Sequence, residues 1–129
     1  MAVTMRREMR EIPSYIPGKP NELPFFIEKK AYQGATGRVY PLPYTDQLSN
    51  VPVMKAYDMV TLENEYISVE CLPELGGKIH GATLKSNGYE FIYRNTCIKP
   101  AMVGLAGPWV SGGIEFNWPQ HHRPTTFMP

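Results

Sequence analysis

Cysteine is scarce in this sequence: the 129 residues contain only Cys71 and Cys97, which do not form a Cys-X-X-Cys motif. A disulfide framework is therefore not the source of stability. None is needed, because a compact chain of this length buries roughly two-thirds of the surface that its unfolded form exposes. We expect both thiols to be reduced and buried.

Long apolar runs are also absent. The longest, residues 101–110, is interrupted by Gly104, Gly107 and Pro108, whereas a helix that crosses a bilayer needs about 20 apolar residues. Charges begin at Arg6, which leaves no room near the N-terminus for the apolar stretch of a secretion signal. We therefore expect a cytoplasmic location and no membrane partner.

Neither sign of charge dominates, since 13 basic and 12 acidic residues give a net charge of +1. Nucleic-acid binders and polybasic membrane modules present a strongly positive surface, so the charge balance argues against both. Uncharged ligands are bound by aromatic faces and fixed hydrogen-bonding groups, and the chain has 8 Tyr and 2 Trp. The composition favours a neutral saccharide as partner, with no nucleic acid and no cofactor.

Proline and glycine are abundant, at 13 and 11 residues, which argues against a helical bundle and, with the many aromatics, favours an all-β fold. Alternating and aromatic-rich stretches predict strands at 25–32, 37–42, 55–62, 65–72, 78–84 and 89–94. Residues 1–24, which contain four prolines, are expected to form a frayed or extended N-terminal arm, with the folded domain at 25–129.

Turn signals separate these strands. A turn at 33–36, a proline-rich loop at 43–52 and a break at 73–77 follow from the glycine and proline positions. Asn87-Gly88 predicts a hairpin with a type I′ turn between the last two strands, because both residue types accept a positive φ. In the strand at 65–72, Ile67, Val69 and Cys71 fall on one face, as in a half-buried strand.

The densest group of chemically active residues lies near the C-terminal end. Within nine positions stand a carboxylate, two amides, an indole, two imidazoles and a guanidinium: Glu115, Asn117, Trp118, Gln120, His121, His122 and Arg123. They follow Gly112-Gly113, a pair that allows close backbone approach. The same spacing also fits a proline-terminated strand that leads into a polar surface loop, so spacing alone leaves both interpretations open.

These residues carry a resemblance. The stretch from Ile67 to Ile79 (ISVECLPELGGKI), followed by Ser111-Gly112-Gly113-Ile114 and Phe116-Asn117-Trp118-Pro119, resembles the opening of the galactose mutarotase-like superfamily. The chain from Phe25 to Pro129 resembles more closely an uncharacterised bacterial family in which a mutarotase-like domain precedes tetratricopeptide repeats. The signature of that family, "GLAGPW.SGGIEFNWPQHHRP", is matched from Gly104 to Pro124.

The resemblance implies the N-terminal part of a mutarotase-like supersandwich, an antiparallel β-sandwich. It also implies a carbohydrate-active domain, aldose epimerase-like or glycoside hydrolase-like. Mutarotases use a His as general acid and a Glu from the C-terminal half as general base, so His121 or His122 is the candidate acid. Neighbouring side chains on an extended segment point to opposite faces, which leaves the choice between the two open. The sequence departs from the epimerase branch at His122-Arg123-Pro124, where that branch has "HGFAR".

Other assignments remain as alternatives. For a glycosidase, Glu115 would be one of two carboxylates, its partner being Glu74, Asp58 or a residue beyond Pro129. Arg94 could bind a substrate hydroxyl or phosphate, or be a solvated residue at a strand end. His80 lies within a strand and is expected to be structural, and no standard zinc-ligand spacing occurs.

The catalytic candidates are thus Glu115, His121 and His122, and the substrate-binding candidates are Arg94, Asn117, Trp118, Gln120 and Arg123, with no metal. Replacing Glu115 or His122 with Ala should remove activity or sugar binding, whereas His80→Ala should not. The alternative is a non-catalytic carbohydrate-binding or scaffolding module beside a repeat array. In either case we expect the chain alone to be inactive and to self-associate, through a free strand edge or through the face that carries Ile67, Val69 and Cys71.

Overall fold

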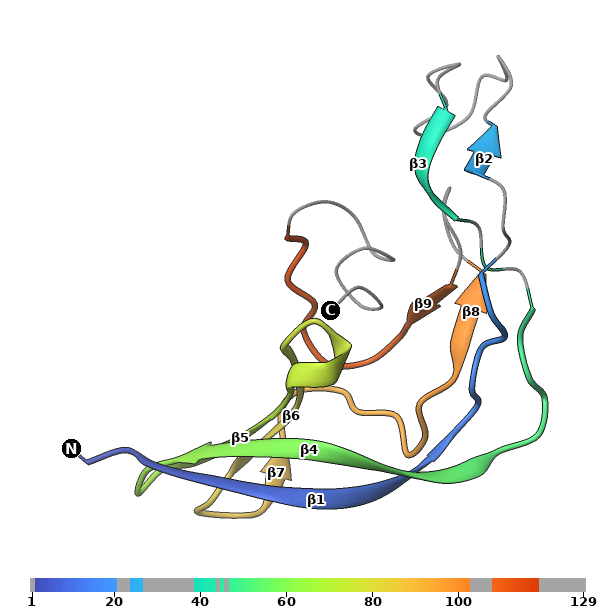
Figure 1. Cartoon of the computed structure of the whole chain (residues 1–129). Coiled ribbons are helices and arrows are strands. Elements are labelled where there is room, and N and C mark those ends of the chain that lie inside the picture. The colour runs from blue at the N-terminus through green and yellow to red at the C-terminus, as the bar shows by residue number, and fades with distance from the viewer. Residues whose placement is uncertain are drawn as a thin grey trace.

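The computed structural model describes residues 2–20, 24–26, 39–43, 45, 47–102 and 108–118. Their regular secondary structure is almost entirely antiparallel β-strand, so the all-β prediction is confirmed. Figure 1 shows the strands and one short 3₁₀ helix. The elements are β1 (Thr4–Ser14), β2 (Pro24–Phe26), β3 (Val39–Pro43), β4 (Val53–Glu63), β5 (Ile67–Leu72), η1 (Pro73–Leu75), β6 (Lys78–Leu84), β7 (Tyr89–Glu90), β8 (Pro100–Met102) and β9 (Pro108–Val110).

The main structure is a five-stranded antiparallel sheet with the order β1-β4-β5-β6-β7. Its edge strand β1 comes from the segment expected to be an N-terminal arm. Residues 4–14 are extended, as expected, but they are not frayed, because they pair with β4 along the whole of its length, from Thr4 opposite Glu63 to Ser14 opposite Val53. The smaller pairs β2–β3 and β8–β9 form two separate ribbons.

Cross-strand register divides the sheet into two faces of opposite character, because residues that face each other across a ladder point to the same side. One side carries Tyr57 and Met59 and is called here the core face. The other carries Val60 and Leu62 and is called the open face. The register places Arg6, Glu8 and Arg10 of β1 on the core face with Tyr57 and Met59.

The hydrophobic core lies on the core face, toward one end of β1 and β4. It is formed by Ile12, Tyr57, Met59, Leu72, Leu75, Ile98 and Val110. Buried Ser14 is satisfied by a hydrogen bond from the Tyr57 hydroxyl at 3.0 Å, and it donates to the Ile12 carbonyl at 2.9 Å. In Figure 1, η1 and the β8–β9 pair, which supply Leu75 and Val110, lie above the long strands.

The predicted hairpin exists, but with a different turn. β6 and β7 pair through Leu84 and Tyr89, which leaves a four-residue connection rather than a two-residue type I′ turn. Gly88 has a φ of 71°, whereas Asn87 does not have a positive φ. The Asn87 side chain instead accepts a hydrogen bond from the Tyr89 backbone N–H at 3.0 Å, a local bond typical of Asn in turns. β7 is also shorter than the predicted strand at 89–94.

Both cysteines are free, as expected, but neither is buried, because Cys71 and Cys97 are both partly exposed. Cys71 lies on the open face of the sheet, opposite Val60. Among the described residues, no helix is long and apolar enough to cross a bilayer.

Candidate functional site

The candidate site begins where residues 108–118, here called the 108–118 segment, reach the free edge of β6. Gly112 and Gly113 have φ values of 81° and 69° and turn the chain toward β6. Ile114 and Ile79 then exchange two backbone hydrogen bonds, at 2.9 and 3.0 Å. The turn thus adds one bridge to the sheet edge and fixes the start of the polar stretch.

A second row of contacts holds the same turn from the other side. The Gly113 backbone N–H donates to the Tyr93 carbonyl at 2.7 Å. The Asn95 side-chain N–H donates to the Ser111 hydroxyl at 2.6 Å, and the Asn95 side-chain oxygen accepts from the Tyr93 hydroxyl at 2.6 Å. Tyr93 and Asn95, the two neighbours of Arg94 in the chain, therefore lie beside the glycine pair.

Lys78 anchors the segment from within the core. Its side chain is only 3% exposed, and its Nζ donates to the Val110 carbonyl at 2.9 Å. Burial lowers the pKa of Lys78, and the carboxylate of Glu115 acts in the opposite direction. The predicted catalytic residue Glu115 is therefore the nearby negative charge for a buried ammonium.

Beyond Glu115 the chain presents aromatic and amide groups to solvent. Trp118 is 82% exposed and Phe116 is 48% exposed, and Asn117 between them is exposed as well. The Trp118 backbone N–H donates to the Phe116 carbonyl at 2.9 Å, which makes a tight local turn. The indole is held on an ordered backbone and is open to a partner.

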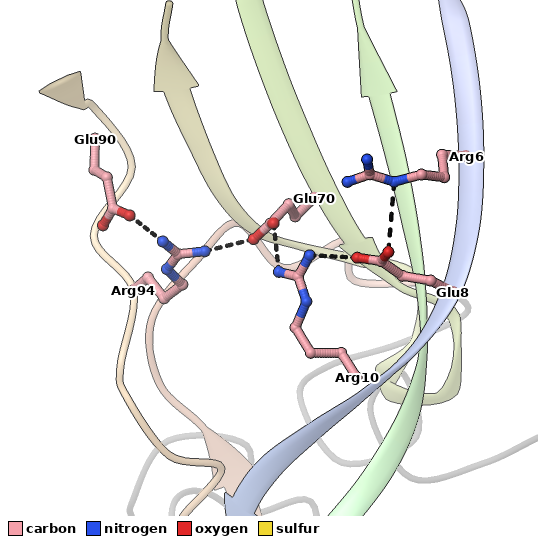
Figure 2. Close-up of polar contacts among 6 residues, drawn as sticks. All are labelled: Arg6, Glu8, Arg10, Glu70, Glu90 and Arg94. Carbon is pink, nitrogen blue, oxygen red and sulfur yellow. Dashed lines mark hydrogen bonds and ion pairs between the residues drawn. The ribbon is translucent and has the colours of Figure 1, made fainter. Parts of the chain in front are cut away.

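Arg94 belongs to a chain of ion pairs that crosses the core face (Figure 2). Glu70 of β5 accepts from Arg10 of β1 on one carboxylate oxygen and from Arg94 on the other. Arg94 also donates to Glu90 of β7. The network continues from Arg10 to Glu8 at 2.7 Å, and from Glu8 to Arg6 at 3.5 Å.

This network defines what Arg94 does in the described structure. Two of its nitrogens are engaged by Glu70 and Glu90, and the side chain is 27% exposed, so Arg94 is not a fully solvated strand end. Its guanidinium lies over Gly81, where an added Cβ would stand 3.2 Å from the Arg94 Cδ. Gly81 thus gives this side chain the room to cross the sheet.

His80 is 8% exposed and lies in β6, where β5 and β6 shift register. Its pKa is lowered, first by burial and then by the positive charge of Arg94. The folded protein therefore favours the neutral imidazole.

A pH prediction follows from His80. Below its ordinary pKa of 6.5 the unfolded chain binds a proton that the folded chain resists, so the free energy of unfolding should fall as the pH drops below about 6.5. Urea denaturation at several pH values measures this slope, and His80→Gln should reduce it between about pH 6.5 and 5. The paired carboxylates Glu8 and Glu63, whose pKa values are lowered by their partners, contribute only nearer their ordinary value of 4.5. Equal slopes in the two proteins would assign the effect to other groups.

The carboxylates considered as glycosidase partners of Glu115 are engaged elsewhere. Asp58 lies on the open face and is bound by Arg7, which lowers the pKa of Asp58. Glu74 in η1 accepts from the Asp58 backbone N–H at 3.1 Å and pairs with Lys55 at 3.2 Å. Among the described residues, no group of three or more His, Cys, Asp and Glu side chains is placed to hold a metal ion.

Of the eight predicted site residues, the structure describes Glu115, Asn117, Trp118 and Arg94. It brings the first three together on one segment and places residues 93–95 beside the turn that leads into it. Gln120, His121, His122 and Arg123 lie outside the described residues. Sequence reasoning missed Lys78 and Glu70. The only signal for Lys78 was its position at a strand start directly after two glycines.

Comparison with known families identifies the chain. Residues 35–129 match the model of a domain of unknown function, DUF5107. The chain belongs to the DUF5107 family. A crystal structure of a TPR-domain-containing protein from Parabacteroides distasonis ATCC 8503 is similar, with 31% sequence identity and a TM-score of 0.80. The similarity covers 98% of this DUF5107 chain and 21% of that protein, so the chain spans about a fifth of its length.

Proposed function

We propose that this DUF5107 chain forms part of a carbohydrate-active domain of a larger protein, and that residues 115–118 contribute to binding a neutral saccharide. The observation that carries the proposal is Trp118, whose indole is 82% exposed beside an exposed amide. An exposed indole beside an exposed amide offers a ligand both an apolar face and hydrogen-bonding groups. A sugar fits, because its CH face packs on an indole while its hydroxyls bond to amide and carboxylate groups.

The supporting contacts also make the position of Trp118 well defined. The segment is bonded at Ile114 to the edge of β6, and it is tied at Val110 to buried Lys78. A binding group on such a base loses little conformational freedom when its ligand arrives. The near-zero net charge of the chain is consistent with an uncharged ligand.

The sugar chemistry proposed for the larger protein is epimerase-like or glycosidase-like, within a mutarotase-like β-supersandwich. His121 or His122 would act as general acid, and a carboxylate beyond residue 129 would act as general base. A non-catalytic binding module is the second candidate. It is favoured by the engagement of Arg94, Asp58 and Glu74 in ion pairs within the described structure.

The test uses the full-length protein that contains this chain. A glycan array should identify a neutral saccharide, and calorimetry with that saccharide should show at least a tenfold loss of affinity for Trp118→Ala, as expected for about 1.5 kcal/mol of lost stacking. Tyr89→Ala is the matched control, because Tyr89 is an aromatic residue with 62% exposure on the open face of the sheet.

Two results would overturn the proposal. One is unchanged affinity in Trp118→Ala. The other is an array in which only nucleic acid or phospholipid binds, with binding that collapses as salt is added. Catalysis is tested separately by turnover of the identified sugar, with Glu115→Gln and His122→Ala as the variants expected to lose it and His80→Ala as the variant expected to keep it.

A further inference from the structure

Most side chains on the open face of the five-stranded sheet are apolar. Pairing places Met5 opposite Leu62, Leu62 opposite Val69, and Val69 opposite Ala82, in one row across four strands. A neighbouring row runs through Val60, Cys71 and Ile79. The apolar residues of the open face are Met5, Met9, Met54, Ala56, Val60, Leu62, Ile67, Val69, Cys71, Ile79, Ala82, Leu84 and Tyr89.

Much of this surface faces solvent. Met5 is 71% exposed, Met9 65%, Tyr89 62%, Met54 58% and Leu62 38%. The elements that form the core with the sheet, η1 and β9 among them, pack through Leu75 and Val110 on the opposite side, with Tyr57 and Met59. Within the described residues, the sheet is therefore covered on one face only.

The charges on the open face do not oppose association between like surfaces. Arg7 and Asp58 lie there as diagonal neighbours and form an ion pair with each other. Glu11 lies toward one end of the face. The surface thus has little net field, and a second copy would meet few unpaired charges of its own sign.

The size of the surface also fits a dimer. The five most exposed apolar side chains present on the order of 500 Å², and the half-buried ones between them add more, against the roughly 800 Å² that each partner contributes to a stable interface. Three of the five are methionines, whose flexible side chains adapt to a facing surface. The largest apolar patch on a monomer, about 300–600 Å², is often a functional surface.

We infer that the open face is an interface between two copies of this chain, packed sheet against sheet about a two-fold axis. Pairing through the edge of β1 is less favourable, because four charged residues lie within five positions along that edge, Arg6, Arg7, Glu8 and Arg10, and charged edge strands resist pairing. The inference does not rest on the proposed saccharide site, which lies on a different segment, residues 115–118, joined to the sheet edge through the bridge between Ile114 and Ile79.

Sedimentation velocity of the full 129-residue chain between about 1 and 100 µM tests this interface, and the mass should double within that range. Val69→Lys, at the centre of the open face, should raise the dissociation constant at least tenfold. Ser68→Lys is the control, because Ser68 is the half-buried neighbour on β5 whose side chain points to the core face. A chain that stays monomeric at about 100 µM, or two variants that associate equally, would overturn the inference.

Thiol labelling locates the contact in the unmodified chain, even if a lysine variant fails to fold. Cys71 lies on the open face, whereas Cys97 lies outside the sheet, next to Ile98 of the core. The rate at which a maleimide labels Cys71 should fall severalfold as the chain associates, while the rate at Cys97 stays constant. A Cys71 rate that does not change while the mass doubles would place the interface elsewhere and contradict the inference.

Discussion

Replacing Gly113 by alanine should lower the free energy of unfolding by about 3 kcal/mol or more and release the 108–118 segment from β6. Gly113 has a φ of 69°, and an added Cβ would stand 3.1 Å from the Ile79 carbonyl carbon and closer still to its oxygen. That oxygen accepts the hydrogen bond from the Ile114 N–H. The backbone therefore has to move, and both hydrogen bonds of the bridge are lost with it. Urea denaturation measures the loss of stability, and hydrogen exchange at Ile114 measures the release.

Gly88→Ala is the matched control for the conformational part of this cost. Gly88 has nearly the same φ, 71°, but an added Cβ there meets nothing within 4 Å. Its variant should lose about 1 kcal/mol, the cost of a left-handed conformation without a clash. If both alanine variants were destabilised equally, the close approach of Gly113 to Ile79 would not be a determinant of the fold.

The strands of the second half could be predicted because their signals are local. In β5 the alternation of Ile67, Val69 and Cys71 identifies one face, and the glycines at 76–77 mark the following break. The hairpin turn was predicted wrongly because Asn87-Gly88 occurs in turns of more than one length. Here the Leu84 carbonyl accepts from the Gly88 N–H at 2.9 Å, which closes a longer connection than the type I′ turn allows.

The role of β1 could not be seen from residues 1–24 alone. A strand rich in Arg and Glu with exposed methionines has no local reason to be ordered, and its order comes from pairing with β4 about fifty residues later. The ion-pair network could not be predicted for the same reason, since its partners are far apart in the sequence. Arg10 and Glu70 are 60 positions apart, and they meet because the registers of β1–β4 and β4–β5 place them on the same face.

Part of the candidate site was visible in the sequence because its residue types are unusual. Glu115, Asn117 and Trp118 stand close together in the chain and remain together in the structure. The dependence on Lys78 was not visible, since a lysine is ordinarily an exposed residue. Its burial follows from the bridge between Ile79 and Ile114, which brings the 108–118 segment over the start of β6.

Lys78→Met should cost about 2 kcal/mol of stability, although methionine has a similar length and is better suited to a core. The ammonium of Lys78 is the hydrogen-bond donor to the Val110 carbonyl, and its charge offsets that of Glu115. Without the ammonium, the Val110 carbonyl loses its hydrogen-bond donor, and because Val110 is only 2% exposed, water has little access to replace it. Lys78→Ala should cost more, about 3 to 4 kcal/mol, because it also opens a cavity. Denaturant unfolding of the three proteins gives these differences.

Lys85→Met controls for the loss of a lysine charge just after the other end of β6. Lys85 is paired with Glu63 at 2.8 Å, but its side chain is 37% exposed, so its loss should change stability by no more than about 0.5 kcal/mol. A buried ion can also be replaced by an apolar side chain without loss. A Lys78→Met protein as stable as the unmodified chain would mean that the hydrogen bond to Val110 does not hold the segment.

The double variant Lys78→Met with Gly113→Ala distinguishes one anchoring unit from two separate effects. Lys78 and Gly113 hold the same segment, and an added Cβ at Gly113 would lie 3.3 Å from the Lys78 Cε. Once either substitution has released the segment, the second substitution removes less stability, because the contact it breaks is already weakened. The double variant should therefore lose less stability than the sum of the two single losses, by about 1 kcal/mol or more. Strict additivity would instead mean that the core contact of Lys78 and the bridge at Ile114 stabilise the fold independently, and that the segment presenting Trp118 has two separate supports.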